Sequence, residues 1–453
     1  MKNTVLALLA VAASTLVAAE PKLETEFWQK QIDAAAAKGG GRVVVPAGRH
    51  VTGQLYLKSG VELHLAEGAS LEGAPGSQNY TRHVLPFSEG DWMAVVMALD
   101  AENVAITGKG EIFGNGKLFE KREVAKGCHE GLRPRGVFFG NCRNIRLEDF
   151  TLRDAASWGI VLKCCDGMVA RRVKINSNAN HNNDGFDIEA KNVLIEDCDV
   201  DSGDDAYCIK SNTPDYTVEN ITVRNCIARS HCNGFKIGTA SHGTIRRIRF
   251  EHNRTAASRR VYRDLAPMPT DLTQWAKVPA GVPKYLTGAG IGAICVECVD
   301  GGIVEDVVAD DIEIAGFQVP FFVRGGTRSG RKCGTPPNNK YILKDVVISN
   351  IRGRAEQAVA SSITGVKGCR PVNVVVRNVD IECVGEGENA SPFAEPGPEA
   401  AGKYPEGTMF RDYHLPCYGL YVAQADLVKL ENVKFTVRKG TVDARDPVFI
   451  SQK

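Results

Sequence analysis

Two short acidic clusters lie one after the other in the middle of the chain. Residues 182–187 read Asn-Asn-Asp-Gly-Phe-Asp, and residues 202–205 read Ser-Gly-Asp-Asp. Asp204 and Asp205 therefore follow Asp184 by 20 and 21 residues. Carboxylates held close together cannot all ionise freely, so the pKa of one rises beside its ionised neighbours. Acid–base hydrolysis requires such a pair, and the clusters predict a hydrolase centre.

The sequence around these clusters repeats one pattern of short β-branched strands and turns. The pattern starts near residues 144, 168, 192 and 220 and returns near 303, 343, 372 and 430. A unit of about 20–30 residues that recurs many times indicates a solenoid. Its apolar alternation suits strands with one face in a narrow core, and the fixed leucine pattern of leucine-rich repeats is absent. We predict an all-β, right-handed parallel β-helix, whose neighbouring strands, roughly 4.8 Å apart, bring the clusters together.

Length and composition agree with one long domain over residues 20–453. The chain has 453 residues, and a solenoid grows in length without enlarging its core. A net charge of +1 supplies no basic field for nucleic acid or an anionic membrane. Residues 254–286 and 385–405 depart from the repeat, and we expect long loops there that line a binding cleft. We expect a monomer.

The first forty residues contain two separate signals. Lys2 precedes a short apolar run that ends in Val-Ala-Ala, which is typical of a secretory signal peptide over residues 1–19. The run is too short to span a bilayer, so we expect a secreted or periplasmic mature chain without membrane insertion. Residues 24–38 then predict a short helix that caps the solenoid, with Phe27, Ile32 and Ala35 on its apolar side.

The 14 cysteines allow two interpretations. Cys142, Cys198 and Cys226 recur near strand ends, which favours small buried thiols stacked in the core over disulfides. Four later cysteines, in more irregular sequence, are the better candidates for disulfides; they are Cys333, Cys369, Cys383 and Cys417. No pair of CxxC motifs is present, so we expect no structural zinc and no cofactor.

Taken together, the motifs resemble those of glycoside hydrolase family 28, the polygalacturonases and rhamnogalacturonan hydrolases. The two acidic clusters are similar to the family's acidic motifs, and residues 43–48 and 55–59 are similar to its opening coil. Residues 108–116 and 404–410 match two further landmarks, so the resemblance covers most of the chain. It implies an enzyme that hydrolyses α-linked galacturonosyl bonds in pectin, either in a rhamnogalacturonan or at a chain end.

The resemblance also implies the role of each acidic residue. Asp204 lies at the position of the general acid, and Asp184 and Asp205 lie where carboxylates activate water. Close carboxylates are typical of retaining glycosidases, but the family resemblance implies inversion.

This chain departs from the family pattern at two places. Asn233 replaces the usual histidine, and His231, two residues earlier, is a partial substitute if both lie on one strand. Residues 293–295, Ala-Ile-Cys, replace the Arg-Ile-Lys that binds a galacturonate carboxylate. Lys210 and Lys236 remain as candidate partners of an acidic sugar. The loss of two cations predicts poor action on plain polygalacturonate and better action where the sugar at that subsite is neutral.

Several alternatives stay open at this stage. Asn-Asp-Gly and Gly-Asp-Asp are also turn sequences that decorate solenoid corners without catalysis. A β-helical polysaccharide lyase that uses calcium, or a solenoid that binds carbohydrate without cleaving it, would share the fold. Trp158 is either a stacking platform for a sugar or an apolar filler. Glu297 either replaces the missing cation site or is a solvated strand residue, and we favour the solvated strand residue.

Overall fold

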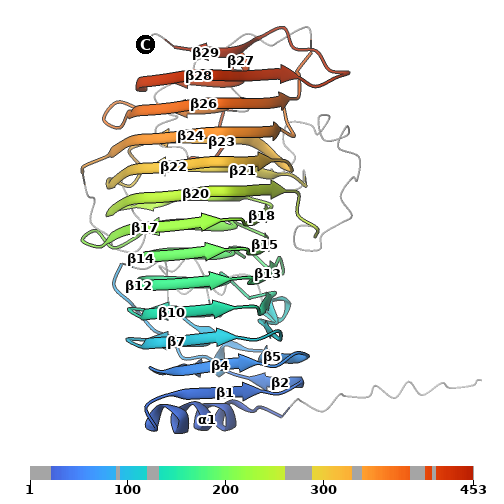
Figure 1. Ribbon diagram of the computed structural model, residues 1–453, viewed down its shortest axis with the longest axis vertical. Helices are drawn as coiled ribbons and strands as arrows, with labels where there is room; N and C mark the ends of the chain where they lie inside the picture. Colours follow the sequence, from blue (N-terminus) through green and yellow to red (C-terminus); the bar gives the residue numbers. More distant parts are fainter. Residues whose placement is uncertain are drawn as a thin grey trace, which may run out of the picture.

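The computed structural model describes residues 22–87, 92–119, 132–260, 288–328, 339–387, 404–410 and 415–451. Every pairing between named strands in these ranges is parallel, and successive coils stack along one axis (Figure 1). The predicted parallel β-helix is therefore confirmed. The predicted signal peptide, and most of the two predicted loops, lie outside the described residues.

Each complete coil contributes to three parallel sheets, which we call A, B and C. Sheet A contains β1 (Gly41–Val45), β4 (Val61–Leu65), β7 (Glu102–Thr107), β10 (Arg143–Glu148), β12 (Ile160–Arg171), β14 (Phe186–Glu196), β17 (Thr217–Arg224), β20 (Thr244–Ala256), β22 (Ile303–Ile314), β24 (Ile342–Arg354), β26 (Pro371–Cys383) and β28 (Asp426–Val437). Sheet B contains β2 (Gly48–Thr52), β5 (Ala69–Gly73), β8 (Glu111–Phe113), β11 (Thr151–Arg153), β13 (Lys174–Ser177), β15 (Asp199–Ser202), β18 (Ile227–Ser230) and the ends of β20, β22, β24, β26 and β28.

Sheet C carries the site described below. It contains β3 (Leu55–Tyr56), β6 (Ala94–Leu99), β9 (Arg135–Gly140), the first residues of β12 and β14, β16 (Tyr207–Ser211), β19 (Asn233–Ser241), β21 (Gly290–Cys298), β23 (Phe317–Gly325), β25 (Ser361–Thr364), β27 (Cys417–Ala423) and β29 (Asp446–Ile450). The chain runs from sheet B to sheet C at one corner of each coil.

The core is narrow and built from identical positions of successive coils. Phe186, Tyr207 and Phe235 stack in register, with ring centroids 5.7 and 5.3 Å apart. At the corner where sheet C turns into sheet A, Asn192 and Asn220 both adopt a φ of 56°. Asparagine tolerates this left-handed conformation, and the Asn220 amide donates a hydrogen bond to the Asn192 side chain at 2.9 Å. Apolar stacking inside and amide ladders at the corner fix the register of the coils.

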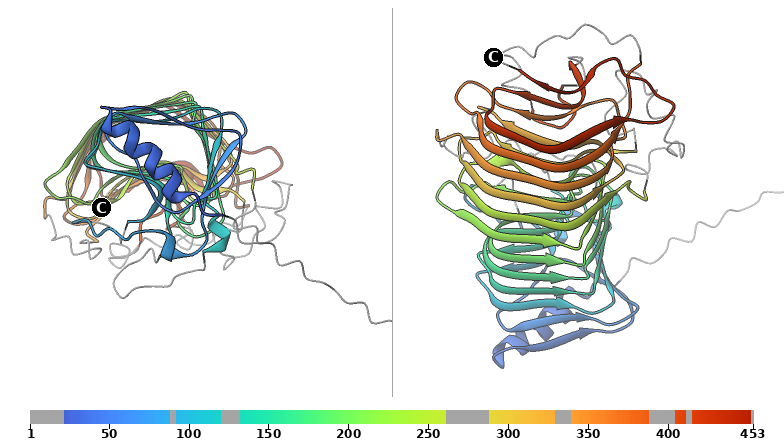
Figure 2. Two further views of the ribbon diagram at one scale, coloured as in Figure 1. Left: turned by 90° about the horizontal axis from the view of Figure 1, so that it is seen from below. Right: turned by 45° about the horizontal axis from the view of Figure 1, so that its top comes forward.

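The helix α1 (Thr25–Ala37) covers the exposed end of the first coil, as predicted (Figure 2). Its buried side chains are Trp28 and Ile32, whereas Phe27 is 55% exposed. The prediction is confirmed for Ile32 and wrong for Phe27, because Trp28 faces the coil in place of Phe27. No helix among the described residues is long and apolar enough to cross a membrane.

The cysteines are thiols in the part of the chain that the structure describes. Cys142, Cys198 and Cys226 are buried in the core, which confirms the stacking interpretation. Cys369, Cys383 and Cys417 are also free and buried, so their assignment as disulfide candidates is wrong. Cys383 belongs to the main apolar core, and Cys417 packs in a second apolar cluster with Phe322 and Tyr421. Cys333 lies outside the described residues.

We predict that Phe235→Ala destabilises the solenoid strongly. The ring is fully buried between Tyr207 and the next coils, so its loss removes apolar contacts and leaves a cavity. The free energy of unfolding should fall by about 3–5 kcal/mol. Urea denaturation followed by circular dichroism measures the change. Phe27→Ala, on the exposed face of α1, is the matched control and should change the midpoint little; equal effects of the two substitutions would contradict the assignment.

Candidate active site

The two acidic clusters occupy the same corner of successive coils, between sheet B and sheet C. β13 and β15 end before this corner, and β14 and β16 begin after it. Because Phe186 pairs with Tyr207, the residues before them stack in the same order, and the Gly185 amide donates to the Asp205 carbonyl at 2.8 Å. The predicted stacking of the clusters across one coil is thus observed.

The turn that carries Asp204 is held from two neighbouring strands. The hydroxyls of Ser202 and Ser230 both donate to the Asp204 carbonyl oxygen, at 2.6 and 2.5 Å. Gly203 passes so close to Asn178 that a Cβ atom there would lie 2.7 Å from the amide oxygen. Serine and glycine at these positions therefore let the backbone turn tightly and fix the Asp204 side chain at the corner.

Asp205 is buried and held by two groups from β19. The Asn233 amide donates to one carboxylate oxygen at 2.7 Å, and the Lys236 ammonium pairs with the other at 2.9 Å. Burial alone would raise the pKa of Asp205. The charges of Lys236 and Lys210 outweigh it, so the pKa of Asp205 is lowered and this carboxylate is ionised.

Asp184, one coil earlier, has a different environment. Lys210 lies 3.3 Å from its carboxylate and 2.6 Å from that of Asp187, and its ammonium is also 3.9 Å from the centre of the Trp158 ring. Burial and the charge of Asp187 raise the pKa of Asp184 well above its ordinary value, although Lys210 opposes them. The single positive charge of Lys210 is shared by Asp184 and Asp187, so it cannot neutralise the negative charges of both carboxylates.

Asp204 differs from the other two carboxylates because it is only half-buried. Burial of the carboxyl and the charge of Asp205 raise its pKa to about 6. The same corner therefore holds an ionised carboxylate, Asp205, next to an acid that keeps its proton up to mildly acidic pH. Environments that push two adjacent pKa values apart define an acid–base pair.

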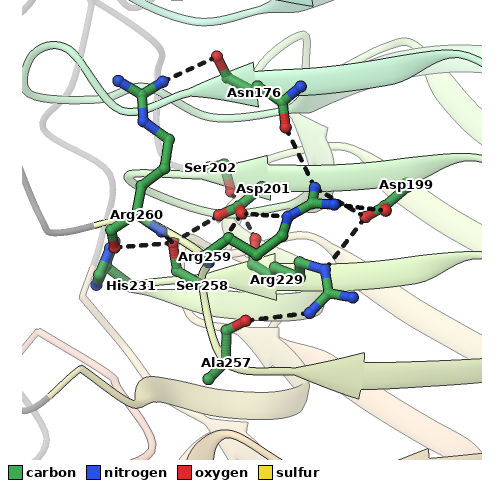
Figure 3. Close-up of polar contacts among 10 residues, drawn as sticks. All are labelled: Asn176, Asp199, Asp201, Ser202, Arg229, His231, Ala257, Ser258, Arg259 and Arg260. Carbon is green, nitrogen blue, oxygen red and sulfur yellow. Dashed lines mark hydrogen bonds and ion pairs between the residues drawn. The ribbon is translucent and has the colours of Figure 1, made fainter. Parts of the chain in front are cut away.

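His231 is not brought to these carboxylates by any described contact. It belongs to the turn between β18 and β19, so it does not share a strand with Asn233. It is buried, and its Nε2 lies 2.9 Å from the Arg260 carbonyl oxygen. Figure 3 shows the surrounding network, in which Asp201 binds the backbone of Arg259 at 2.9 Å. This network attaches residues 257–260 to sheet B beside the corner.

The other predicted binding residues lie at the site, but their polar groups already bind other protein groups. Lys210 and Lys236 pair with protein carboxylates as described above. Asn233 bridges Asp205 and Cys295, whose thiol lies 3.3 Å from the amide oxygen. Cys295 is fully buried. Neither Cys295 nor Ala293 carries a positive charge, so the two cations that the sequence lacks here are not replaced by these residues.

Two site residues were missed or misjudged from the sequence. Asp187 belongs to the first acidic cluster, and its place one residue after inward-facing Phe186 was the signal that it faces outward. Glu297 is fully buried, so the prediction of a solvated residue is wrong. Strand alternation correctly put Glu297 on the outer face but gave no sign that this face is covered. Trp158 is 3% exposed and packs in an apolar cluster, which favours the filler interpretation.

Among the described residues, one group has donor atoms close enough to hold a metal ion. Oxygens of Asp204 and Asp205 and the Cys232 sulfur lie within 4.8 Å of one another. A thiolate is a poor ligand for calcium, and the pKa of the Cys232 thiol is raised well above its usual range by burial and by Asp204. The donor set therefore does not fit a calcium site of the kind that a lyase would need.

Comparison with known proteins gives an independent view of the chain. Residues 38–227 match the family described as glycosyl hydrolases family 28, a range that contains all three aspartates but ends before Asn233 and Lys236. A probable polygalacturonase of Arabidopsis thaliana is 28% identical over 46% of this chain and 48% of its own, and an exo-poly-alpha-D-galacturonosidase of Dickeya chrysanthemi is 27% identical over 41% and 38%. The chain therefore spans less than half the length of these curated relatives.

The structural comparison extends over more of the chain. A family 28 exopolygalacturonase of Yersinia enterocolitica superposes with a TM-score of 0.64 and 18% identity, covering 94% of this chain and 77% of that one. At this level of identity the superposition supports the β-helical fold and carries no information about the substrate.

We predict that Lys236→Met raises the pKa of both Asp204 and Asp205. Removal of the ammonium takes away the charge that favours their ionised forms, and the effect should be larger on Asp205, which it contacts. Titration of side-chain carboxyl carbons by NMR measures the two values. Lys174→Met, an exposed lysine on β13, is the control and should leave both unchanged. Unshifted values in Lys236→Met would remove the lysine from the electrostatics of the site.

Proposed function

Because the chain belongs to glycosyl hydrolase family 28, we propose that it hydrolyses α-linked galacturonosyl bonds of pectic polysaccharides with inversion at the anomeric carbon. The names of the relatives support this substrate class, since they include polygalacturonases and exopolygalacturonases from plants, bacteria and fungi. The observation that carries the proposal is the pair of adjacent carboxyls, Asp204 and Asp205, with opposite pKa shifts.

In the proposed mechanism Asp204 is the general acid. It is the most accessible of the three aspartates, and its carboxyl retains a proton below about pH 6. It donates this proton to the departing glycosidic oxygen as the bond to the anomeric carbon breaks. The ionised Asp205, fixed by Asn233 and Lys236, accepts a proton from the attacking water, and Asp184 orients that water from the preceding coil.

The two other interpretations of the fold have less support. A lyase would abstract a proton beside a uronate carboxylate with the help of calcium, and the donor set at the corner does not suit that ion. Burial of carboxylates costs free energy. A solenoid that only binds carbohydrate gains nothing from buried carboxylates with different pKa values, so that cost would have no functional return. Family membership and the pKa pattern together favour hydrolysis.

We further propose that cleavage occurs at a chain end, because the outer face of sheet C is covered before the site. An apolar cluster there, the Trp92 cluster, consists of Trp92, Ala94, Met97, Phe138, Trp158 and Val161. Leu85 packs against it, and the Lys163 ammonium donates to the Phe87 carbonyl at 2.8 Å. The segment before β6 therefore lies over the strands that a long polymer would have to follow.

The outer face of sheet C is also covered after the site. A second apolar cluster, the Phe322 cluster, consists of Cys295, Phe322, Ala360, Phe410, Leu415, Cys417, Tyr421 and Ala423. Phe410 and Leu415 come from the segment between β26 and β27 and pack onto β21, β23 and β27. Between the two clusters, the described strands of sheet C are β14, β16 and β19, which span on the order of 10 Å at the usual strand spacing. This length accommodates a few sugar units rather than a long polymer.

We predict that Asp204→Asn lowers kcat by about 10²–10⁴-fold without changing the fold, because the amide cannot supply the proton. The activity of the wild-type enzyme should also fall as pH rises through about 6, where Asp204 loses its proton. Reducing-end assays on pectic oligosaccharides measure both effects. Asp166→Asn, an exposed carboxylate on β12, is the control. Near-normal turnover by folded Asp204→Asn would exclude Asp204 as the acid.

We predict that the enzyme releases small products from chain ends from the first minutes of reaction. The covered strands on both sides of the site prevent a polymer from lying along sheet C. The viscosity of a pectic polymer should therefore fall slowly while reducing ends accumulate. Oligosaccharides with chemically blocked ends should resist cleavage. A rapid loss of viscosity with a random distribution of long products would contradict chain-end action.

A further inference from the structure

Glu297 is a buried carboxyl that the proposed mechanism does not use. It lies on β21, pairs in register with Arg324 of β23, and is fully buried. Neither of its carboxyl oxygens has a hydrogen-bond partner among the described residues. A buried polar group without a partner is costly, and it calls for a ligand or a neutral state.

The carboxyl of Glu297 faces the same side as the catalytic groups. Its neighbours Val296 and Cys298 belong to the main core, whereas Cys295 belongs to the outer Phe322 cluster. On β19, Gly238 packs closely against Glu297, because a Cβ atom at residue 238 would lie 3.0 Å from the Cβ of Glu297 and 2.8 Å from its carbonyl oxygen. The backbone of β19 therefore lies directly against Glu297.

Cations surround Glu297 without binding it. The Lys236 ammonium is paired with Asp205, and Arg328 is paired with Asp300. Arg324 donates to the Thr364 hydroxyl at 3.1 Å. Burial raises the pKa of Glu297 to about 8 despite the charges of Lys236 and Arg328. At neutral pH the carboxyl keeps its proton, so it has one hydrogen to donate and oxygens that accept.

We propose that Glu297 determines specificity by hydrogen bonding to hydroxyl groups of a neutral sugar next to the scissile bond. This inference rests on the proposed function. Because the bond that is cut is galacturonosyl, the neutral unit is the leaving group. Sugar hydroxyls both donate and accept, and they complement a buried carboxyl without adding a charge. A uronate in the same place would meet a carboxyl, with Ala293 and Cys295 offering no cation to bind it.

The test uses two oligosaccharides that differ in one group. Both carry a galacturonosyl unit at the bond to be cut, and the leaving unit is either galactose or galacturonate. We compare kcat/KM for the two, and we measure their dissociation constants with the Asp204→Asn variant, which does not require turnover. The wild-type chain should prefer the neutral leaving unit. Glu297→Lys should shift this preference toward galacturonate by about 10–100-fold, the usual strength of one charge-assisted hydrogen bond.

Two further variants make the result decisive. Glu297→Gln is nearly isosteric and retains a donor and an acceptor, so it should keep neutral binding within a few-fold even if Glu297→Lys does not fold. Glu356→Gln is the matched control, since Glu356 is an equally buried carboxyl that pairs with Arg354 and Arg438 elsewhere in the solenoid. It should alter stability and leave the preference unchanged.

The outcomes separate this inference from the proposed function. A wild-type preference for the acidic leaving unit, a folded Glu297→Lys variant that keeps the wild-type preference, or a loss of more than a few-fold in neutral-sugar binding by Glu297→Gln would each overturn the role of Glu297 while hydrolysis stands. Absence of any hydrolysis would instead overturn the proposed function, and the binding measurements would still decide whether Glu297 distinguishes the two ligands.

Discussion

The fixed register between successive coils is the constraint on which the site depends. Pairing of Phe186 with Tyr207 and of Tyr207 with Phe235 places Asp184, Asp205 and Asn233 above one another at a single corner. A slip of one residue would turn every side chain of a strand to the opposite face. The stacked rings in the core and the asparagine ladder therefore do more than stabilise the solenoid, because they set the distances between the carboxyls of the proposed active site.

Register also explains why these carboxyls have different pKa values. Lys236 lies one coil beyond Asp205 and binds it directly, whereas Lys210 divides its charge between Asp184 and Asp187. Asp204 has no lysine in direct contact in the described structure. The negative charge of Asp205 therefore affects the pKa of Asp204 more than the positive charge of Lys236 does. Three chemically identical groups thus acquire three protonation behaviours from the order in which cations occur along neighbouring strands.

The sequence predicted the features that depend on local spacing. The period of the repeat, the stacking of the aspartates one coil apart and the burial of Cys142, Cys198 and Cys226 all follow from short-range pattern, whereas the place of the aspartates in a turn between strands was not predicted. It could not place His231 relative to Asn233, because a turn between them breaks the alternation that a single strand would have. It also could not reveal the burial of Glu297, which depends on segments distant in sequence that fold over sheet C.

These covering segments give one scaffold its particular chemistry. In a bare solenoid, the outer face of sheet C would expose a uniform row of side chains to water. Phe410 and Leu415 on one side, and Leu85 on the other, cover parts of that row with apolar side chains. Exclusion of water strengthens each remaining electrostatic interaction and makes an unpaired group such as Glu297 expensive unless a substrate satisfies it. The proposed selectivity therefore depends on the segments that interrupt the repeat, while the proposed acid–base pair depends on the repeat itself.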